Sequence, residues 1–133
     1  RGLPAGGAAA AGLVELATEG PPPPPTYKHQ AVCVRGRLYV LGGGDYRPAA
    51  ASMDTVHVLD LAAAPAAWAR LRCGGAAPCA RVAHTAEYDA ATARVYVFGG
   101  FDRELERLAD LFTLHLPTAT WRRVSGGGGG GDG

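Results

Sequence analysis

Short runs of large apolar residues alternate with connectors rich in glycine, proline and alanine along most of this chain. Four such runs follow one another: His29–Val34, Arg37–Leu41, Thr55–Leu61 and Trp68–Arg72. They are rich in Val, Leu, Tyr and Trp and are bounded by Gly, Pro or Asp, as is typical of short β-strands. No convincing helical period is present, and Asp102–Ala109 is expected to form one turn of helix in a loop at most. The pattern predicts an all-β fold.

The same four runs recur about 55 residues further along the chain. The second set is His84–Tyr88, Arg94–Phe98, Asp110–Leu116 and Trp121–Val124. Insertions lie in the connectors, whereas the strand-like runs keep their lengths. Three features recur at matched positions, namely a histidine that begins strand one, a glycine pair that closes strand two and a tryptophan that opens strand four. These residues are His29 and His84, Gly42 and Gly43 with Gly99 and Gly100, and Trp68 and Trp121.

A partial third copy precedes these two. Leu13–Leu16 aligns without a gap on Trp68–Leu71, so the chain is expected to open with the last strand of an earlier unit. The predicted division runs from a low-complexity segment (1–12) through the end of an earlier unit with a proline-rich connector (13–28), a repeat (29–72), a connector (73–83) and a second repeat (84–124) to a glycine-rich tail (125–133).

Residues that are duplicated with the repeat are expected to build the fold. The glycine pairs leave room where the chain turns close to other backbone, and they lack the spacing of a nucleotide-binding loop. The tryptophans are expected to pack between neighbouring sheets. The histidines are expected to make structural hydrogen bonds, because one active site does not need two copies. Cys33 is interpreted as a small buried hydrophobe.

Composition and charge argue against several classes of partner and modification. A net charge of +1 with scattered arginines predicts neither a nucleic-acid nor a membrane partner. The three cysteines are too few for a disulfide framework, and the absence of asparagine excludes N-glycosylation. Both features favour an intracellular location, cytoplasmic rather than nuclear. No signal-peptide pattern is visible. The chain opens on Arg1 without a methionine, so we interpret it as a fragment.

No constellation of catalytic or metal-binding residues is expected. Cys73, Cys79 and His84 do not have the spacing of a zinc site. Ser52 and Ser125 lie in loops without a nucleophile elbow. We therefore expect no metal, no cofactor and no enzymatic activity.

Four strands per unit, with a diglycine after the second and a tryptophan at the fourth, resemble the kelch motif. The segments "LYVLGG…VHVLDL…W" and "RVYVFGGF…DLFTLHLPTATW" carry this resemblance, which covers roughly Leu13–Val124. It implies a partial β-propeller, with about two four-stranded antiparallel blades plus the last strand of a preceding blade.

The resemblance also implies where partners bind. In kelch propellers the loops from strand two to strand three, and from strand four to the next blade, lie on one rim. Here the two loops between strands two and three (44–54 and 101–109) differ while the strands agree, as expected if the loops carry recognition. Because Tyr and Arg often dominate interface energetics, the candidate protein-binding residues are Tyr46, Arg47, Arg103, Glu104 and Arg107. The alternative is that they are ordinary solvated loop residues.

The expected function is a non-catalytic protein–protein interaction module with unidentified protein partners. The resemblance allows the substrate-binding part of a ubiquitin ligase adaptor, whose partners would include ubiquitin ligase components. A cytoskeletal or structural scaffold remains an alternative. A propeller-type copper oxidase is a weaker one, because Tyr27, Tyr46, His57 and His115 fit no ligand pattern. The prolines of 20–26 are interpreted as an expanded connector rather than as a ligand for an SH3 or WW domain.

Overall fold

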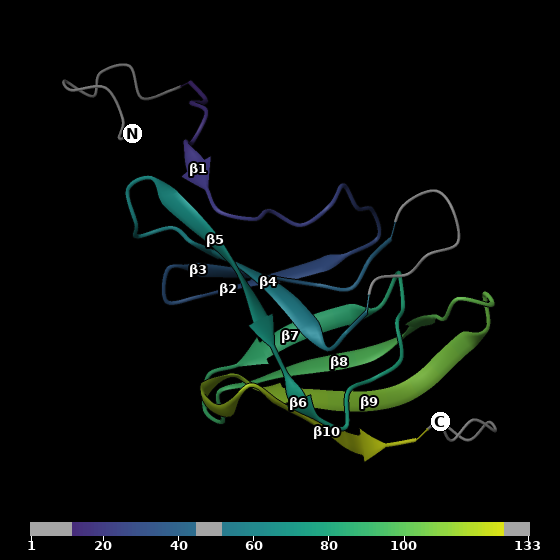
Figure 1. Cartoon of the computed structure of the whole chain (residues 1–133). Coiled ribbons are helices and arrows are strands. Elements are labelled where there is room, and N and C mark those ends of the chain that lie inside the picture. Colours follow the sequence, from purple (N-terminus) through teal and green to yellow (C-terminus); the bar gives the residue numbers. More distant parts are fainter. Residues whose placement is uncertain (1–11, 45–51, 127–133) are drawn as a thin grey trace.

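The computed structural model describes residues 12–44 and 52–126 and consists of two five-stranded sheets, one above the other in Figure 1. The first sheet has the order β1-β5-β4-β3-β2 and the second β6-β10-β9-β8-β7. The first contains β1 (Thr18–Glu19), β2 (Gln30–Val34), β3 (Arg37–Leu41), β4 (Thr55–Asp60) and β5 (Ala66–Arg72). The second contains β6 (Gly74–Gly75), β7 (Thr85–Asp89), β8 (Arg94–Phe101), β9 (Arg107–His115), the 3-10 turn η1 (Leu116–Thr118) and β10 (Thr120–Ser125).

Each sheet is a four-stranded antiparallel meander with one short parallel addition. β2 to β5 pair in chain order, and so do β7 to β10, which confirms the all-β prediction of two four-stranded units. β1 then pairs in parallel with β5, and β6 with β10. Because β6 follows β5 directly, the chain crosses from the first sheet to the outer edge of the second (Figure 1). The sequence did not predict this crossing.

The two units place their recurring residues at equivalent positions. Trp68 lies opposite Leu59 and Trp121 opposite Leu114, which are aligned positions of the repeat. Both glycine pairs adopt positive φ, with values of 66° and 92° in the first copy and 69° and 102° in the second. Residues other than glycine rarely adopt this conformation, which explains the recurrence of the diglycine. The predicted duplication is therefore confirmed at the level of the backbone.

One predicted strand is not observed. Leu13–Leu16 is not a strand, because none of the described segments lies beside it to complete a ladder. Asp102–Ala109 contains no helical turn, which agrees with the expectation of one turn at most. Its last residues instead extend the ladder between β8 and β9, in which Phe101 pairs with Arg107 and Gly100 with Leu108. Backbone pairing with β8 thus overrides the weak local preference for helix.

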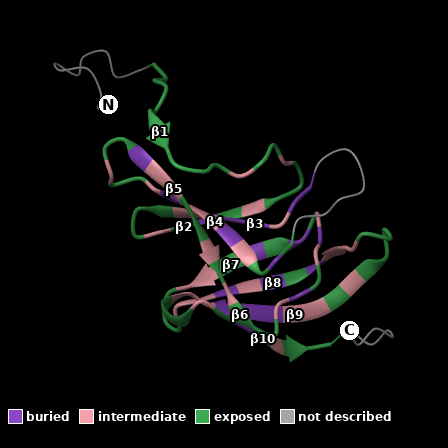
Figure 2. Ribbon diagram, viewed as in Figure 1, coloured by how far each residue is buried: buried purple, intermediate pink, exposed green. Residues whose placement is uncertain are grey.

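The hydrophobic core lies between the two sheets (Figure 2). The first sheet contributes Val32, Leu41, Met53 and Val56 to it, and the second contributes Ala86, Val95, Val97, Phe112, Leu114 and Trp121. Side chains alternate across a strand, so the neighbours of these residues point away from the core. On β2, Val32 is buried while Ala31 and Cys33 are exposed.

The prediction that Cys33 is buried is therefore wrong. Its aligned residue in the second unit, Tyr88, is partly buried and packs against the core, because the first sheet lies opposite it. None of the described segments covers the equivalent face of the first sheet at Cys33. Within residues 12–44 and 52–126, no helix is long and apolar enough to cross a membrane.

Candidate functional site

The connections from strand two to three and from strand four to one lie at the same end of both sheets. The ladders require this, because Gln30 at the start of β2 pairs with Leu41 at the end of β3, and Thr55 pairs with Arg72 in the same way. Backbone bridges join the two kinds of connection, as between Tyr27 and Gly44. We call this end of the molecule the rim, and define its described part as residues 20–29, 42–44, 52–54, 73–84 and 102–106.

The tip of the β8–β9 hairpin is a closed turn built around Asp102. The Asp102 carboxylate accepts the backbone N–H groups of Glu104 and Glu106, each at 2.9 Å. The N–H of Leu105 donates to the backbone oxygen of Asp102 at 3.0 Å, and the N–H of Asp102 donates to Glu106 at 3.1 Å. An aspartate that binds following backbone groups is a common way to fix a tight turn.

This turn presents Leu105 to solvent. The side chain is 74% exposed, and its backbone has φ of +63°. The left-handed conformation costs a residue with a Cβ about 1–2 kcal/mol. Neither burial nor backbone preference favours a leucine at this place. An exposed apolar side chain in a strained but well-bonded turn is a candidate contact residue.

The predicted rim residues are only partly brought together. Arg103 and Glu104 are exposed on the Asp102 turn, beside Leu105. Arg107 is exposed too, but it is the first residue of β9 and is paired with Phe101, so it belongs to the strand rather than to the loop. Tyr46 and Arg47 lie outside the described residues. Sequence reasoning missed Leu105, although one apolar residue in the polar run "DRELER" was a usable signal.

His84 is buried between the sheets. Its Nε2 lies 3.1 Å from the carbonyl oxygen of Leu41, and its Nδ1 has no hydrogen-bond partner among the described residues. Burial lowers the pKa of His84 to about 4, and this outweighs the opposing effect of the bond to Leu41. The ring is therefore neutral near pH 7 and donates its Nε2–H to the first sheet. His29, at the aligned position, is exposed.

Two further recurring residues meet at the contact between the sheets. The indole N–H of Trp121 donates to the backbone oxygen of Met53 at 2.8 Å, and Trp121 is 1% exposed. A Cβ on Gly42 would lie 2.4 Å from Cε1 of His84, so this contact has room only for glycine. Trp68, the counterpart of Trp121, is only partly buried.

Arg81 is a buried charge that sequence reasoning missed. Its guanidinium donates to both carboxylate oxygens of Asp110, at 2.6 and 3.1 Å, and to the carbonyl oxygen of Gly99 at 3.1 Å. It also lies over the ring of Phe112, 5.6 Å from the centroid. Burial opposes the charge on Arg81, but the pair with Asp110 outweighs it and raises the arginine pKa.

This ion pair is not duplicated in the first unit, so it is not among the recurring residues of the repeat. Thr26 stands at the position of Arg81 in the first unit, and Thr55 at that of Asp110.

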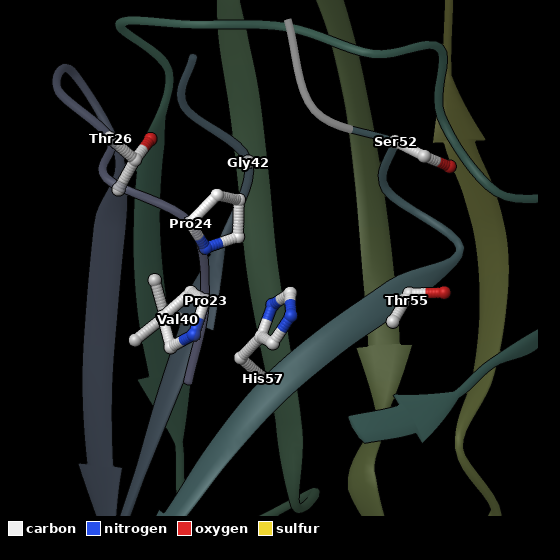
Figure 3. Close-up of a pocket in the computed structure, with 8 residues that line it drawn as sticks. All are labelled: Pro23, Pro24, Thr26, Val40, Gly42, Ser52, Thr55 and His57. Carbon is white, nitrogen blue, oxygen red and sulfur yellow. The ribbon is translucent and has the colours of Figure 1, made fainter. Parts of the chain in front are cut away.

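A cavity of about 200 Å³ opens on the first sheet at the rim. Its lining is Pro23, Pro24, Thr26, Val40, Gly42, Ser52, Thr55 and His57 (Figure 3). Burial, and secondarily the charge of Arg70, lower the pKa of His57, so its ring is neutral near pH 7. The proline rings and Val40 make much of the wall apolar.

Cys73 shows no sign of activation as a nucleophile. All three are free, and Cys73 is partly buried. Burial raises the pKa of the Cys73 thiol to about 11, so this sulfur is a thiol at pH 7 and a poor nucleophile. Among the residues that the structure describes, no three His, Cys, Asp or Glu side chains gather as a metal site would require.

Comparison with known proteins gives the family. Residues 43–131 match the family described as "KLHDC2/KLHL20/DRC7 Kelch-repeats domain". The chain belongs to the kelch-repeat family. It is also 33% identical over 96 residues to "Multiple epidermal growth factor-like domains protein 8" of Mus musculus and, equally, of Homo sapiens. The match covers 70% of this chain but only 3% of those proteins, so the chain spans a small part of their length.

The fold agrees with that of a solved structure. The structure titled "Structure of YjhT" matches with a TM-score of 0.57 and 20% sequence identity, over 77% of this chain and 28% of that one. At this identity the likeness concerns the fold alone. The kelch resemblance and the partial propeller are thus confirmed, and we call β2–β5 blade 1 and β7–β10 blade 2. A narrower similarity, to kelch domain-containing protein 10 through "YKH…LYVLGGG" and "ARVAH", stays a prediction.

Proposed function

We propose that this kelch segment is a non-catalytic protein-interaction module that contacts its partner through the rim. The observation that carries the proposal is the Asp102 turn, which holds Leu105 74% exposed between charged neighbours. Membership of the kelch family supports it, because loops on a rigid β scaffold are common places for recognition.

The chemistry of the turn suits a protein surface. Leu105 offers apolar area that a partner can remove from water, while Arg103 and Glu104 beside it can form ion pairs at the margin. The turn is closed by its own hydrogen bonds, so little conformational entropy is lost when a partner docks. Arg107, on the strand that follows, extends the same charged surface.

The location of the side chains with shifted pKa values supports a non-catalytic role. His84 and Arg81 are buried in packing and are bonded to backbone or to Asp110 rather than facing an open cavity. His57 and His115 lie in different blades, and His115 Nδ1 is 2.8 Å from the hydroxyl of Thr118. This separation argues against a shared copper site.

A matched set of substitutions tests the rim. Leu105→Asn keeps a residue that tolerates positive φ but removes the apolar contact, and Arg103→Glu reverses a charge. We expect each to weaken partner capture by the full-length protein by about tenfold, with an unchanged melting temperature. Leu61→Asn changes another exposed leucine, in the turn at the opposite end, and should leave capture unaffected. Undiminished capture by Leu105→Asn would contradict the proposal.

The finer proposal is that the partner is a substrate or component of an intracellular ubiquitin ligase. Its support is the kelch family alone. Affinity capture of the full-length protein followed by mass spectrometry tests it, because cullin subunits should appear among the captured proteins. Cytoskeletal proteins without cullins would instead favour a scaffold.

A further inference from the structure

The connector that leads into blade 1 follows the same path as the one that leads into blade 2. Residues 20–27 align with residues 75–82 without a gap. Both segments begin with a glycine at positive φ, of 88° in the first and 80° in the second. Both end in an antiparallel backbone bridge, which Tyr27 forms in the first connector and Val82 in the second. The five prolines of the first connector therefore do not lengthen it.

Four of these five prolines are not required by the path of the backbone. The first connector reads "PPPPP" where the second reads "AAPCA", so only Pro23 has a proline, Pro78, at the aligned position. Blade 2 makes the same bridge and the same glycine turn without the other four. A feature that blade 1 adds to a shared backbone is a candidate for function rather than for folding.

Covalent geometry fixes the shape of the proline run. A proline ring holds its own φ at about −65°, and a proline that follows confines the preceding ψ to the extended region. Both restrictions apply to Pro21–Pro24, and no peptide bond within residues 20–27 is cis. This run is therefore a polyproline II segment, in which every third side chain shares a face. Pro25 precedes Thr26 rather than another proline, so its ψ is free and the chain bends there.

The exposure of the connector follows this period of three. Pro23 and Thr26 are partly buried, whereas Pro24, Pro25 and Tyr27 are exposed. Tyr27 is 44% exposed. The residues that the connector presents to solvent at its second half are thus two adjacent prolines and an aromatic ring.

A blade that precedes blade 1 would cover part of this connector, and blade 2 shows how much. Blade 1 precedes blade 2 in the chain and packs against it. At the positions in blade 2 that align with the proline pair and the tyrosine, Cys79 is exposed, and Ala80 and Val82 are partly exposed. We therefore expect the same three positions of the first connector to stay accessible when a neighbouring blade is present.

The outward residues suit the groove of a WW domain. Such domains bind polyproline II segments against aromatic side chains, and many of them take a Pro-Pro-x-Tyr ligand. Residues 24–27 read Pro-Pro-Thr-Tyr, and the hydroxyl of Thr26 is directed to the carbonyl oxygen of Gly44, to which it donates at 3.2 Å. The proline rings are rigid, so little conformational entropy is lost on docking. An SH3 groove, which takes a basic residue beside its prolines, fits less well, because the run lies between Glu19 and Thr26.

We propose that residues 24–27 bind a WW domain of a partner protein. This assignment replaces the interpretation of the prolines as a connector alone. It goes beyond the contact at Leu105, because it adds a second contact on the rim and states which class of domain takes it. The bend at Pro25 and the bridge of Tyr27 belong to the bound form, so the folded connector must bind and not only a free peptide.

The first test measures binding of a purified WW domain of the Pro-Pro-x-Tyr class to the full-length protein by isothermal titration calorimetry. Pro25→Ala and Tyr27→Val introduce the residues that blade 2 has at these positions, so the fold should stay intact, and each should weaken binding by about tenfold. The control is Pro21→Ala, which also introduces the residue of blade 2 but lies outside the four residues. It should change the affinity by less than about twofold. An absence of binding, or full binding by Tyr27→Val, would overturn the proposal.

The second test compares the folded connector with a free peptide of residues 20–28. The peptide and the full-length protein should bind the WW domain with affinities within about tenfold of each other. Binding by the peptide alone would show that the folded connector holds the motif in a form that the groove cannot take, and it would overturn the proposal. Binding of an SH3 domain in place of the WW domain would do the same. Leu105→Asn should leave binding of the WW domain unchanged, so this proposal and the contact at Leu105 can fail separately.

Discussion

The two blades share their strands, turns and recurring residues. The face of blade 2 that carries Trp121 packs against blade 1, whereas none of the described segments covers the aligned face of blade 1. On this face of blade 2, His84, Trp121 and Arg81 are buried and bonded. On the equivalent face of blade 1, His29 is exposed and Trp68 is only partly buried. The difference shows that the repeated residues do not stabilise a blade by themselves. Their contribution depends on the blade that lies opposite.

The largest expected effect separates the two tryptophans. Trp121→Ala removes a side chain that is 1% exposed together with its hydrogen bond to Met53, so we expect a loss of about 3–5 kcal/mol in the free energy of unfolding. Trp68→Ala should cost only about 1–2 kcal/mol, because its ring is partly exposed. Urea unfolding of both variants measures the difference. Equal losses would contradict the conclusion that packing against the opposing blade determines how much each tryptophan contributes to the free energy of unfolding.

The buried ion pair gives the next largest effect. Asp110→Asn leaves the guanidinium of Arg81 buried without a counter-charge, which should lower the free energy of unfolding by about 3 kcal/mol. Thr55→Val at the aligned position in blade 1 should change it by less than about 1 kcal/mol. The same unfolding experiments provide the comparison, and a small effect of Asp110→Asn would show that water reaches Arg81.

The buried His84 should make the stability of the chain depend on pH. The folded-state pKa of His84 is about 4, below its usual value of 6.5, so the unfolded chain takes up this proton first as the pH falls. Stability from His84 is therefore complete above about pH 6.5 and is lost between pH 6.5 and 4, by up to about 3 kcal/mol. Protonation would also place a hydrogen on Nδ1, which has no acceptor among the described residues.

A variant at His84 isolates this contribution, because His57 also has a lowered pKa and acts in the same direction. Stability measured between pH 7 and pH 4 should fall less steeply in His84→Gln than in the unsubstituted chain. An unaltered slope in His84→Gln would assign the acid sensitivity to another group.

The smallest effect distinguishes Gly42 and Gly99, the first glycines of the two diglycine pairs. Gly42→Ala adds the strain of positive φ and a contact with the ring of His84, so we expect a loss of about 2 kcal/mol. Gly99→Ala has similar φ, but its Cβ would meet only the Leu108 carbonyl, at 3.3 Å, and should cost about 1 kcal/mol. Thermal unfolding of the two variants gives the order, and a reversed order would contradict the contact with His84.

The features that could be predicted from the sequence are those that the repeat duplicates. The strands, the glycine pairs and the equivalent tryptophans all follow from local composition and internal alignment. Cys33 was placed wrongly because alternation on β2 says which side chains share a face, not whether that face is covered. The strand predicted at Leu13–Leu16 is absent for a related reason. A segment forms a strand only where another strand lies beside it to accept its backbone hydrogen bonds.

The candidate sites were harder to predict because their residues occur once. Arg81 and Asp110 are 29 positions apart, and only the folded blade brings them together. Leu105 stands out only after the hydrogen bonds of Asp102 fix the turn and expose it. The cavity on the first sheet could not be predicted from the sequence, because its lining residues come from separate segments of the chain.

The crossing from β5 to β6 has a consequence for the outer margin of blade 2. An open strand edge offers unpaired backbone groups to other chains and promotes aggregation. Gly74–Gly75 occupies part of that edge on β10, and these residues precede the rest of blade 2 in the chain. During synthesis β6 therefore leaves the ribosome before β10, the strand whose edge it covers. When β10 forms, part of its edge can pair with β6 at once, and fewer backbone groups remain free to pair with another chain.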